Sequence, residues 1–275
     1  MIQLEKLIDQ IKDPSYIIKT YAFKYHQISK LTKHSILVLS EHIELLKNTS
    51  IVQSMLNSYK SYPTCQQIAL PDVEECENFI SLPEILMGRR SCRGFRNQAI
   101  SLFKLATILK YSYGISGEFD TGFGIQFLRT VPSGGALYPL EIYVLANKIT
   151  GLDQALYHYR INQSALEKIK NIDSHYFKTI ASDWVLPSPP PAIILVSGVL
   201  ARTMIKYQER AYRYVLMEAG MLGMNITLLC EYLGFSTVMI GGYIDDETNK
   251  LIGLDGINEM VLLPIAIGIK DDGNY

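Results

Sequence analysis

The chain has 275 residues, of which 48% are hydrophobic and 19% are charged. This composition is typical of a folded protein with a substantial buried core and excludes a disordered chain. Lysine and arginine (26 residues) nearly balance aspartate and glutamate (27 residues). No net charge therefore favours nucleic acid or an anionic membrane surface as a partner.

The sequence shows no sign of a secreted, membrane-spanning or metal-binding protein. Its longest apolar runs lie around Ala192–Val196 and at Val261–Ile269, and both are shorter than the roughly 20 residues needed to cross a bilayer. The N-terminus lacks the apolar core of a signal peptide, and the four cysteines show no CxxC spacing. The five histidines form no HExxH or HxH pair. We therefore predict a cytoplasmic location and no metal site.

The first 80 residues have a different pattern from the rest of the chain. Apolar residues recur at helical spacing within Leu4–Ile11 and again within Ile36–Leu46, which predicts short helices. A polar break at Asn48-Thr49-Ser50 ends this helical pattern, and the tract from Ser61 to Pro71 is predicted to be a linker. We interpret residues 1–80 as a helical region that caps the core or contacts a partner.

Residues 81–275 are predicted to form one domain of the α+β class. The proline-rich stretch Pro187–Pro191 excludes a helix and predicts an extended loop before a β-branched strand. One face of the longest predicted helix is apolar, and Gly234 follows it as a left-handed cap residue would. That face carries Ala211, Val215, Ala219, Leu222, Ile226, Leu229 and Leu233. The predicted helices are Pro83–Leu86, Leu102–Tyr111 and Thr203–Leu233, and the predicted strands are Leu140–Ala146, Leu156–Tyr159, Ala192–Ser197 and Val261–Ile269.

Three arginines and a serine directly after the first of these helices give the first chemical signal. Guanidinium groups offer charge-assisted hydrogen bonds in a geometry that matches phosphate, and a hydroxyl adds another donor. A solvated basic turn is the competing interpretation. The residues are Arg89, Arg90, Ser91 and Arg93.

Two glycine pairs give the second and third signals. Glycine lets the backbone come close to a flat ligand and exposes N–H groups to its edge. An ordinary tight turn explains each pair as well. The first pair lies in Pro132-Ser133-Gly134-Gly135, which enters a predicted strand, and the second lies in Met239-Ile240-Gly241-Gly242 after the long helix.

The dipeptide Lys206-Tyr207 is a fourth signal. An ammonium group beside a phenol lowers the pKa of the phenol and favours acid–base chemistry. Lys110-Tyr111 is the same dipeptide on another predicted helix, so the dipeptide alone does not indicate a catalytic role. A solvated helix face is the alternative interpretation for each pair.

Taken in order, these segments resemble the nitroreductase superfamily. More narrowly, they resemble the SagB-type dehydrogenases, the azoline oxidases of thiazole/oxazole-modified peptide biosynthesis that include the microcin B17 oxidase. The most specific part is the block from Pro132 to Glu141, and the resemblance covers residues 83–270 well but residues 1–80 thinly. Further matching segments are Tyr25–Lys30, Tyr157–Tyr159, Ala165–Glu167, Ala211–Tyr214 and Met217–Gly220.

The resemblance implies a nitroreductase-like FMN-binding fold, with helices flanking a mixed β-sheet, and a homodimer with FMN at its interface. It places the FMN phosphate at the arginine turn and the Gly241 N–H at flavin N5, and it makes Pro132–Gly135 contact the FMN of the partner subunit. The implied FMN-binding residues are Arg89, Arg90, Ser91, Arg93, Pro132, Ser133, Gly134, Gly135, Met239, Ile240, Gly241 and Gly242. Simple nitroreductases usually end in a basic cluster near the phosphate, whereas only Lys270 remains here, followed by two aspartates.

The implied reaction is the two-electron oxidation of peptide thiazolines or oxazolines to thiazoles or oxazoles. The implied substrate is a cyclised precursor peptide, and the implied partners are cyclodehydratase subunits. The Cα–H of an azoline is acidic because it lies next to a C=N bond and a carbonyl. Tyr207, assisted by Lys206, would remove this proton while a hydride leaves the ring for the flavin. The alternatives are a general NAD(P)H-dependent nitro or quinone reductase, and a flavin-stabilised scaffold subunit of a peptide-modifying complex.

Overall fold

A seven-stranded β-sheet forms the centre of the computed structural model, which describes residues 13–45, 47–56, 59–73 and 80–271. All neighbouring strands of this sheet run antiparallel. A parallel pairing occurs in a small sheet of β2 (Ile100–Ser101) and β6 (Ile149–Thr150). In spatial order, the seven strands are β1 (Gln66–Ala69), β8 (Ala165–Asn171), β7 (Ala155–Arg160), β5 (Leu140–Ala146), β9 (Ala192–Val199), β11 (Glu259–Gly268) and β10 (Ser236–Met239).

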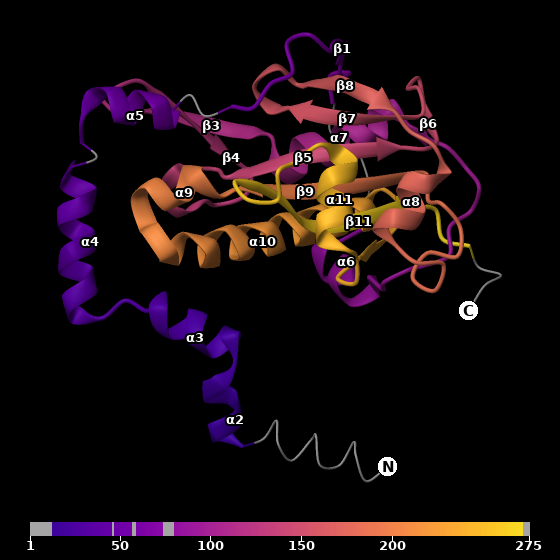
Figure 1. The fold of residues 1–275 in the computed structure, drawn as a ribbon. Helices are drawn as coiled ribbons and strands as arrows, with labels where there is room; N and C mark the ends of the chain where they lie inside the picture. Colours follow the sequence, from indigo (N-terminus) through magenta and orange to yellow (C-terminus); the bar gives the residue numbers. More distant parts are fainter. Residues whose placement is uncertain (1–12, 46, 57–58, 74–79, 272–275) are drawn as a thin grey trace.

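Helices cover both faces of the large sheet, so the predicted α+β fold with flanking helices is confirmed (Figure 1). Helices α7 (Leu102–Tyr113) and α10 (Ala211–Tyr232) pack on one face. Helices α8 (Ser174–Ile180) and α11 (Asp245–Ile252) pack on the other. The result is a three-layer arrangement with an apolar core on each side of the sheet.

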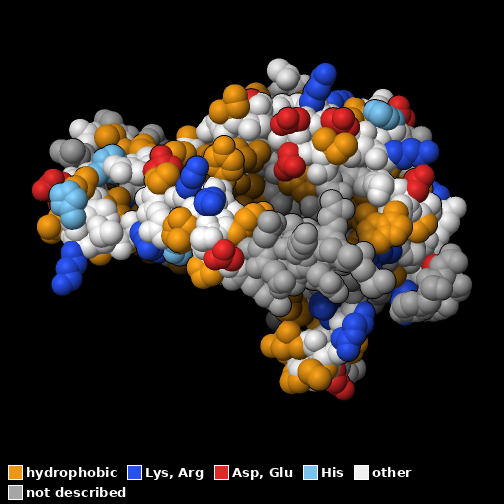
Figure 2. Space-filling view, turned by 60° about the horizontal axis from the view of Figure 1, so that its bottom comes forward, with side chains coloured by type: hydrophobic (Ala, Val, Ile, Leu, Met, Phe, Trp, Pro, Cys, Tyr) orange, Lys and Arg blue, Asp and Glu red, His pale blue; other side chains and the backbone are white. Residues whose placement is uncertain are grey.

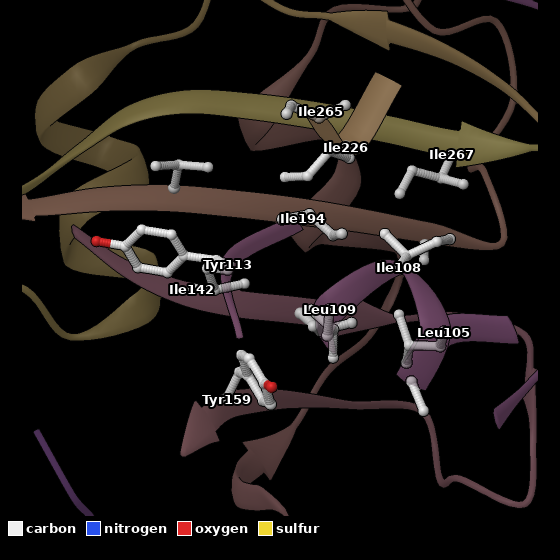
Figure 3. Close-up of a cluster of buried hydrophobic side chains, with 14 of the residues drawn as sticks. Leu105, Ile108, Leu109, Tyr113, Ile142, Tyr159, Ile194, Ile226, Ile265 and Ile267 are labelled. Atoms are coloured by element: carbon white, nitrogen blue, oxygen red, sulfur yellow. The ribbon is translucent and has the colours of Figure 1, made fainter. Parts of the chain in front are cut away.

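Side chains of the central strands alternate between these two cores, because successive residues of a strand point to opposite faces. On β5, Ile142 and Val144 face α7 and α10, whereas Leu145 faces α8 and α11. Figure 3 shows Ile142 and Ile194 of the sheet packed with Leu109 of α7 in the first core. Both faces are buried, which explains why the sequence of these strands is a continuous apolar run.

The long helix predicted for Thr203–Leu233 is divided, and the prediction was wrong in this respect. Helix α9 (Leu200–Tyr207) ends at Gln208, whose φ of 48° and ψ of −134° are not helical. A 3₁₀ turn, η3 (Gln208–Arg210), then leads into α10. Apolar spacing alone does not reveal such a break, since the pattern resumes after it. The predicted left-handed residue Gly234 has a φ of 78° and is confirmed.

Within the described residues, four helices precede the sheet: α2 (Pro14–Lys19), α3 (Tyr21–Ile28), α4 (Lys33–Leu45) and α5 (Thr49–Leu56). The prediction of short helices is confirmed, whereas the break predicted at Asn48-Thr49-Ser50 is shorter than expected, because α5 begins at Thr49. The helix predicted at Leu4–Ile11 lies outside the described residues. Figure 1 shows α2 to α4 as an arm beside the body of the protein, with α5 next to a hairpin of β3 (Ile115–Asp120) and β4 (Ile125–Arg129). The sequence analysis missed this hairpin.

The linker predicted for Ser61–Pro71 was wrong, because Gln66–Ala69 form strand β1 and pair with β8. The residues before β1 are also fixed to the sheet. The Lys60 ammonium bonds to the Tyr143 hydroxyl at 2.6 Å and to the Glu259 carboxylate, and the Tyr62 N–H donates to Glu167 at 3.0 Å. A division of the chain into two folding units near residue 80 stays a prediction.

A buried charged network lies beneath this segment. Each ring nitrogen of His158 is 2.9 Å from a carboxylate oxygen, one from Glu141 and the other from Glu167. Arg202 Nη2 lies 2.6 Å from the second oxygen of Glu141, and Arg160 pairs with Glu167 at 3.3 Å. Burial raises the pKa of Glu141, but the hydrogen bond with His158 and the charge of Arg202 outweigh it and hold that pKa at about 2.

Figure 2 shows Lys and Arg side chains interspersed with Asp and Glu side chains on the face that it draws. The described residues of that face therefore form no continuous basic surface of the kind that binds nucleic acid. Within the described residues, no helix has the length and apolar character needed to cross a membrane, and no group of His, Cys, Asp and Glu has an arrangement that could hold a metal ion.

The network predicts an acid-sensitive fold. The pKa of Glu141 is lower in the folded protein than its usual value of 4.5, so its contribution to stability is present above pH 4.5 and is lost as the pH falls toward 2. The shift corresponds to about 3 kcal/mol. At pH 7, the free energy of unfolding should be lower in Glu141→Gln than in the wild type. Between pH 5 and pH 2, this free energy should fall less in the variant than in the wild type. Urea unfolding at several pH values measures both effects.

Glu118→Gln on the exposed hairpin strand β3 is the matched control and should behave as the wild type. Equal acid sensitivity in Glu141→Gln and the wild type would contradict the assignment.

Candidate functional site

The arginine turn lies beside the segment that contains the second glycine pair. Helix α6 (Leu82–Gly88) starts with a capping box of Ser81 and Glu84 and ends at Arg89. The chain then runs along β10 at the edge of the large sheet. Ser91 forms a bridge with Thr237, and the Cys92 N–H donates to the Thr237 carbonyl at 2.9 Å. This pairing brings the arginines to the strand that leads into Met239–Gly242.

The arginine side chains differ in how they are held. Arg90 Nη1 donates to the carbonyls of Met87 and Arg89 at 2.9 and 2.7 Å, so this guanidinium is folded back on its own turn. The Arg89 and Arg93 side chains make no hydrogen bond or ion pair with any other described residue. Lys270 is also close, because it pairs with Phe95 in an isolated bridge. The one basic residue left near the C-terminus therefore lies at the arginine turn.

The glycine pair next to this turn has open space around it. Met239 is partly exposed and Ile240 is buried, with its N–H donating to the Pro264 carbonyl at 2.9 Å. A β-carbon placed on Gly241 or Gly242 would have no atom within 4 Å. Free guanidinium groups beside an open stretch of backbone fit a ligand with a phosphate and a flat ring.

The first glycine pair lies in a different place, next to Lys206 and Tyr207. Gly135 has a φ of 67°, and a β-carbon there would lie 2.8 Å from both Lys206 Nζ and Tyr207 Oη. The Ser133 hydroxyl accepts a hydrogen bond from the Tyr138 N–H at 2.9 Å and so holds the turn closed. The structure therefore joins Pro132–Gly135 with the Lys-Tyr dipeptide of α9, which are far apart in the sequence.

Tyr207 is half-buried and packs edge-on against Tyr214, with ring centroids 4.8 Å apart. Burial, together with the neighbouring Tyr214, raises the pKa of the Tyr207 phenol above 10. The expectation that Lys206 lowers this pKa was wrong for the single chain. The Lys206 ammonium lies 5.4 Å from the centroid of the Tyr207 ring, and this contact does not offset the loss of hydration around the phenol.

A buried acid behind this turn was missed by the sequence analysis. Glu218 of α10 is 1% exposed and accepts a hydrogen bond from the Tyr113 hydroxyl at 2.9 Å. Burial raises its pKa to about 7, although Ser133, Tyr113 and Arg129 each act to lower it. A single carboxylate next to the apolar face of a long helix is the signal that could have identified Glu218.

Arg129 lies beside the same acid. Its guanidinium is 4.5 Å from the ring centroid of Tyr113 and 4.8 Å from that of Tyr138. Its Nε and Nη1 atoms are buried without a hydrogen-bond partner among the described residues. The aromatic faces therefore contribute to the stabilisation of this buried cation, as do the charges of Glu141 and Glu218.

The two clusters are separated along α10. Tyr214 packs on Gly134, whereas Gly223 packs under Met239. At 1.5 Å per helical residue, these points are about 14 Å apart. The described chain therefore does not bring the arginine cluster (Arg89–Arg93 with Met239–Gly242) and the Lys-Tyr cluster (Pro132–Gly135 with Lys206 and Tyr207) to one point.

Exposed methionines occupy the stretch of α10 between the clusters. They line a cavity of about 540 Å³ together with Pro132, Gly134 and Glu218. The apolar face of α10 is not free to contact a second subunit, because Val215, Ala219, Leu222 and Ile226 are buried in the core of the same chain. The outward face of α10 is exposed to solvent and remains available for contact with another chain. It carries Leu216, Met217, Met221 and Met224.

The family model described as the nitroreductase family matches residues 86–269. The chain belongs to the nitroreductase family. It is 33% identical over 205 residues to a protein of Methanocaldococcus jannaschii that is named as a nitroreductase, and the match covers 74% of this chain and 96% of that protein. It is also 30% identical over 152 residues to the microcin B17-processing protein McbC of Escherichia coli, a match that covers 53% of this chain and 55% of McbC.

Solved structures show the same fold. A nitroreductase-family protein of Anabaena variabilis superposes with a TM-score of 0.70 at 24% identity, covering 90% of this chain and 45% of that one. A chain of the E. coli microcin synthetase McbBCD complex, with truncated pro-MccB17 bound, gives 0.57 at 18% identity, covering 88% and 99%. A nitroreductase of Exiguobacterium sibiricum in complex with FMN gives 0.50 at 17% identity, covering 72% and 92%.

Members of the nitroreductase family are flavin oxidoreductases that typically bind FMN. This chain spans less than half of the Anabaena protein and about half of McbC. The family assignment therefore gives the class of chemistry, and substrate and partners are a separate question.

The Lys-Tyr cluster predicts that Gly135 does not tolerate a side chain. Gly135→Ala should lower the free energy of unfolding by about 1–2 kcal/mol, because a left-handed backbone strains alanine. Gly134→Ala is the matched control, since its β-carbon would meet Tyr214 only at an ordinary 3.5 Å. Guanidinium chloride unfolding compares the two variants, and equal stability would contradict a left-handed backbone at Gly135.

Glu218 predicts a pH dependence of the opposite sign to that of Glu141. Its pKa is about 7 in the folded protein against a usual 4.5, so its stabilising contribution is present below pH 4.5 and is lost as the pH rises through 7. Glu218→Gln stays neutral, so its stability relative to the wild type should increase by up to about 3 kcal/mol from pH 5 to pH 8. A stability difference that does not change over this range would refute the raised pKa.

Proposed function

We propose that this protein is an FMN-dependent azoline dehydrogenase that acts on a cyclised precursor peptide. The observation that carries the proposal is the convergence of Lys206 Nζ and Tyr207 Oη on Gly135. It places an acid–base pair against the glycine segment that, in the SagB-type resemblance, contacts flavin. The similarity to McbC, a microcin B17-processing protein, supports a peptide substrate.

The residues of the arginine cluster suit FMN. Arg89 and Arg93 would bind its phosphate, and the open backbone at Gly241 and Gly242 would face the ring edge. The complete proposed set is Arg89, Arg90, Ser91, Arg93, Pro132, Ser133, Gly134, Gly135, Met239, Ile240, Gly241 and Gly242. When bound, FMN would accept the two electrons that the azoline ring loses.

Lys206 and Tyr207 would handle the proton. The phenolate form of Tyr207 would remove the Cα–H proton of the azoline and become a neutral phenol, while a hydride leaves the ring for the flavin. The Lys206 ammonium would stabilise the negative charge of the phenolate before this transfer. Because the pKa of Tyr207 is raised in the chain by itself, the reactive form of the phenol is scarce at neutral pH. Activity should therefore increase with pH as the phenol ionises.

A homodimer would complete the site. The arginine cluster and the Lys-Tyr cluster lie about 14 Å apart along α10 in one chain. In a homodimer, one flavin would contact the arginine cluster of one subunit and the Lys-Tyr cluster of its partner. The outward face of α10 with its exposed methionines is the proposed seam, since methionine packs well at adaptable apolar contacts. The proposed partners beyond the dimer are cyclodehydratase subunits, and the arm α2–α4 exposes apolar side chains, such as Ile18, Tyr21 and Leu37, that could meet them.

A general NAD(P)H-dependent reductase is the second candidate. The observation that favours it is the 33% identity to the M. jannaschii protein named as a nitroreductase, over 96% of that protein. Rapid bleaching of the bound flavin by NADPH, with no oxidation of azoline peptides, would select this candidate. A scaffold subunit without chemistry would instead keep complex assembly and product unchanged when Lys206 and Tyr207 are replaced.

Substitution of the Lys-Tyr pair tests the proposal. Lys206→Ala and Tyr207→Phe should each reduce azoline oxidation about 10²-fold or more and keep FMN bound, because a lost general base costs this much. The double variant should be little worse than either single one. The readout is the two-dalton mass loss of a cyclised peptide, together with flavin occupancy and the rise of wild-type kcat/KM from pH 7 to pH 9.

Lys110→Ala and Tyr111→Phe on α7 are the matched control, since they change the same dipeptide away from Gly135. They should retain activity. Full activity in Tyr207→Phe with FMN bound would end the proposal for Tyr207, and loss of activity only together with loss of flavin would make the pair structural.

A further inference from the structure

A second cavity, of about 290 Å³, opens directly beside the Lys-Tyr cluster. Lys206 and Gly135 form one of its walls. Helices α4 and α5 of the N-terminal region form a second wall, with Val52 and Leu56 among the lining residues, and the β3–β4 hairpin supplies Phe119 and Phe123 as the third. The cavity thus lies between the proposed acid–base pair and a part of the chain with no role in FMN binding.

Direct contacts hold the N-terminal wall in place. His42 Nε2 of α4 lies 2.7 Å from the Ile205 carbonyl, next to Lys206 in the sequence. Leu56 of α5 packs against the hairpin turn, where a β-carbon on Gly124 would lie 3.2 Å from its Cδ1 atom. Both walls are therefore positioned relative to α9 by the fold of the chain itself.

The lining is apolar in effect, because its polar side chains are already bonded within the chain. Lys47 pairs with Glu44 at 2.6 Å, the Thr121 hydroxyl donates to the Gly124 carbonyl at 2.8 Å, and Gln126 donates to the Phe127 carbonyl at 3.0 Å. Lys206 is different, since its ammonium makes no hydrogen bond or ion pair with any described residue. An occupant therefore meets apolar walls with one cation at their edge.

We propose that this cavity receives an apolar side chain of the peptide next to the azoline ring, so that α4 and α5 select the substrate. The inference rests on the proposed function and names the substrate class of the same site. The volume is at the small end of the range for ligand pockets and suits one side chain rather than a multi-ring molecule. A side chain attached to the ring through the peptide backbone reaches the cavity while the ring lies at Lys206 and Tyr207.

A panel of cyclised peptides that differ only in the residue beside the ring tests the proposal. Wild-type kcat/KM should be about 10- to 100-fold higher with leucine or phenylalanine than with aspartate or glycine, the usual discrimination of an apolar pocket. Val52→Glu should reduce this preference to about threefold or less while keeping FMN bound. Ile257→Glu, a similar apolar-to-acidic change at an exposed position outside the cavity, should keep the full preference.

Photo-crosslinking gives a readout that needs no turnover. A peptide with benzoylphenylalanine beside the ring should label residues 43–56 or 119–137, and Val52→Glu should suppress the label. Azoline oxidation without preference for the neighbouring residue would overturn the inference but leave the proposed function standing. Absence of azoline oxidation with every peptide would overturn the proposed function. The crosslink is independent of turnover, and a label outside these segments would overturn the inference. Loss of FMN from Val52→Glu would show that the cavity belongs to the cofactor and would also overturn it.

Discussion

The close packing of α10 on the sheet is the contact on which the arrangement of the site depends. Two glycines make it possible: a β-carbon on Gly223 would lie 2.6 Å from Leu263 Cδ2, and one on Gly198 would lie 2.7 Å from Val215 Cγ1. With α10 seated at this depth, the helix reaches both glycine segments, through Tyr214 at one point and through Gly223 beneath Met239 at another. The same helix therefore builds the core and sets the spacing of the two clusters.

The charged network beneath residues 59–69 has a comparable role for the N-terminal region. The Lys60 ammonium bonds to Tyr143 and Glu259, and the Tyr62 N–H donates to Glu167, so this segment adds hydrogen-bond partners to polar groups buried on the sheet. Because β1 follows at once and pairs with β8, the chain enters the sheet at a fixed place. The helices before it are thereby directed toward the hairpin and Lys206, where they form the wall of a cavity.

Burial also sets the acid–base properties around the two clusters. Glu141 and Glu218 are both almost fully buried, yet their pKa values shift in opposite directions. Glu141 has a histidine and an arginine against its two oxygens, whereas Glu218 has mainly hydroxyl partners that do not compensate for the loss of water. The pKa of Tyr207 shifts in the same direction as that of Glu218, since burial raises it too. Glu218 and Tyr207 therefore hold their protons more strongly than exposed groups of the same kind.

The sequence by itself determined the fold class and the central strands, because buried strands leave local patterns that need no neighbours. Its glycine and arginine motifs indicated the candidate segments for the site in the same way. It did not determine the break at Gln208, the strand β1 in the expected linker or the face of α10 left outside. These depend on contacts between distant residues: a backbone conformation set where α9 meets α10, a pairing with β8, and the choice of which apolar stripe the sheet covers. The raised pKa of Tyr207 and the position of Gly135 against Lys206 belong to the same group. Only the tertiary structure decides them, since burial and distance are properties of the packed chain.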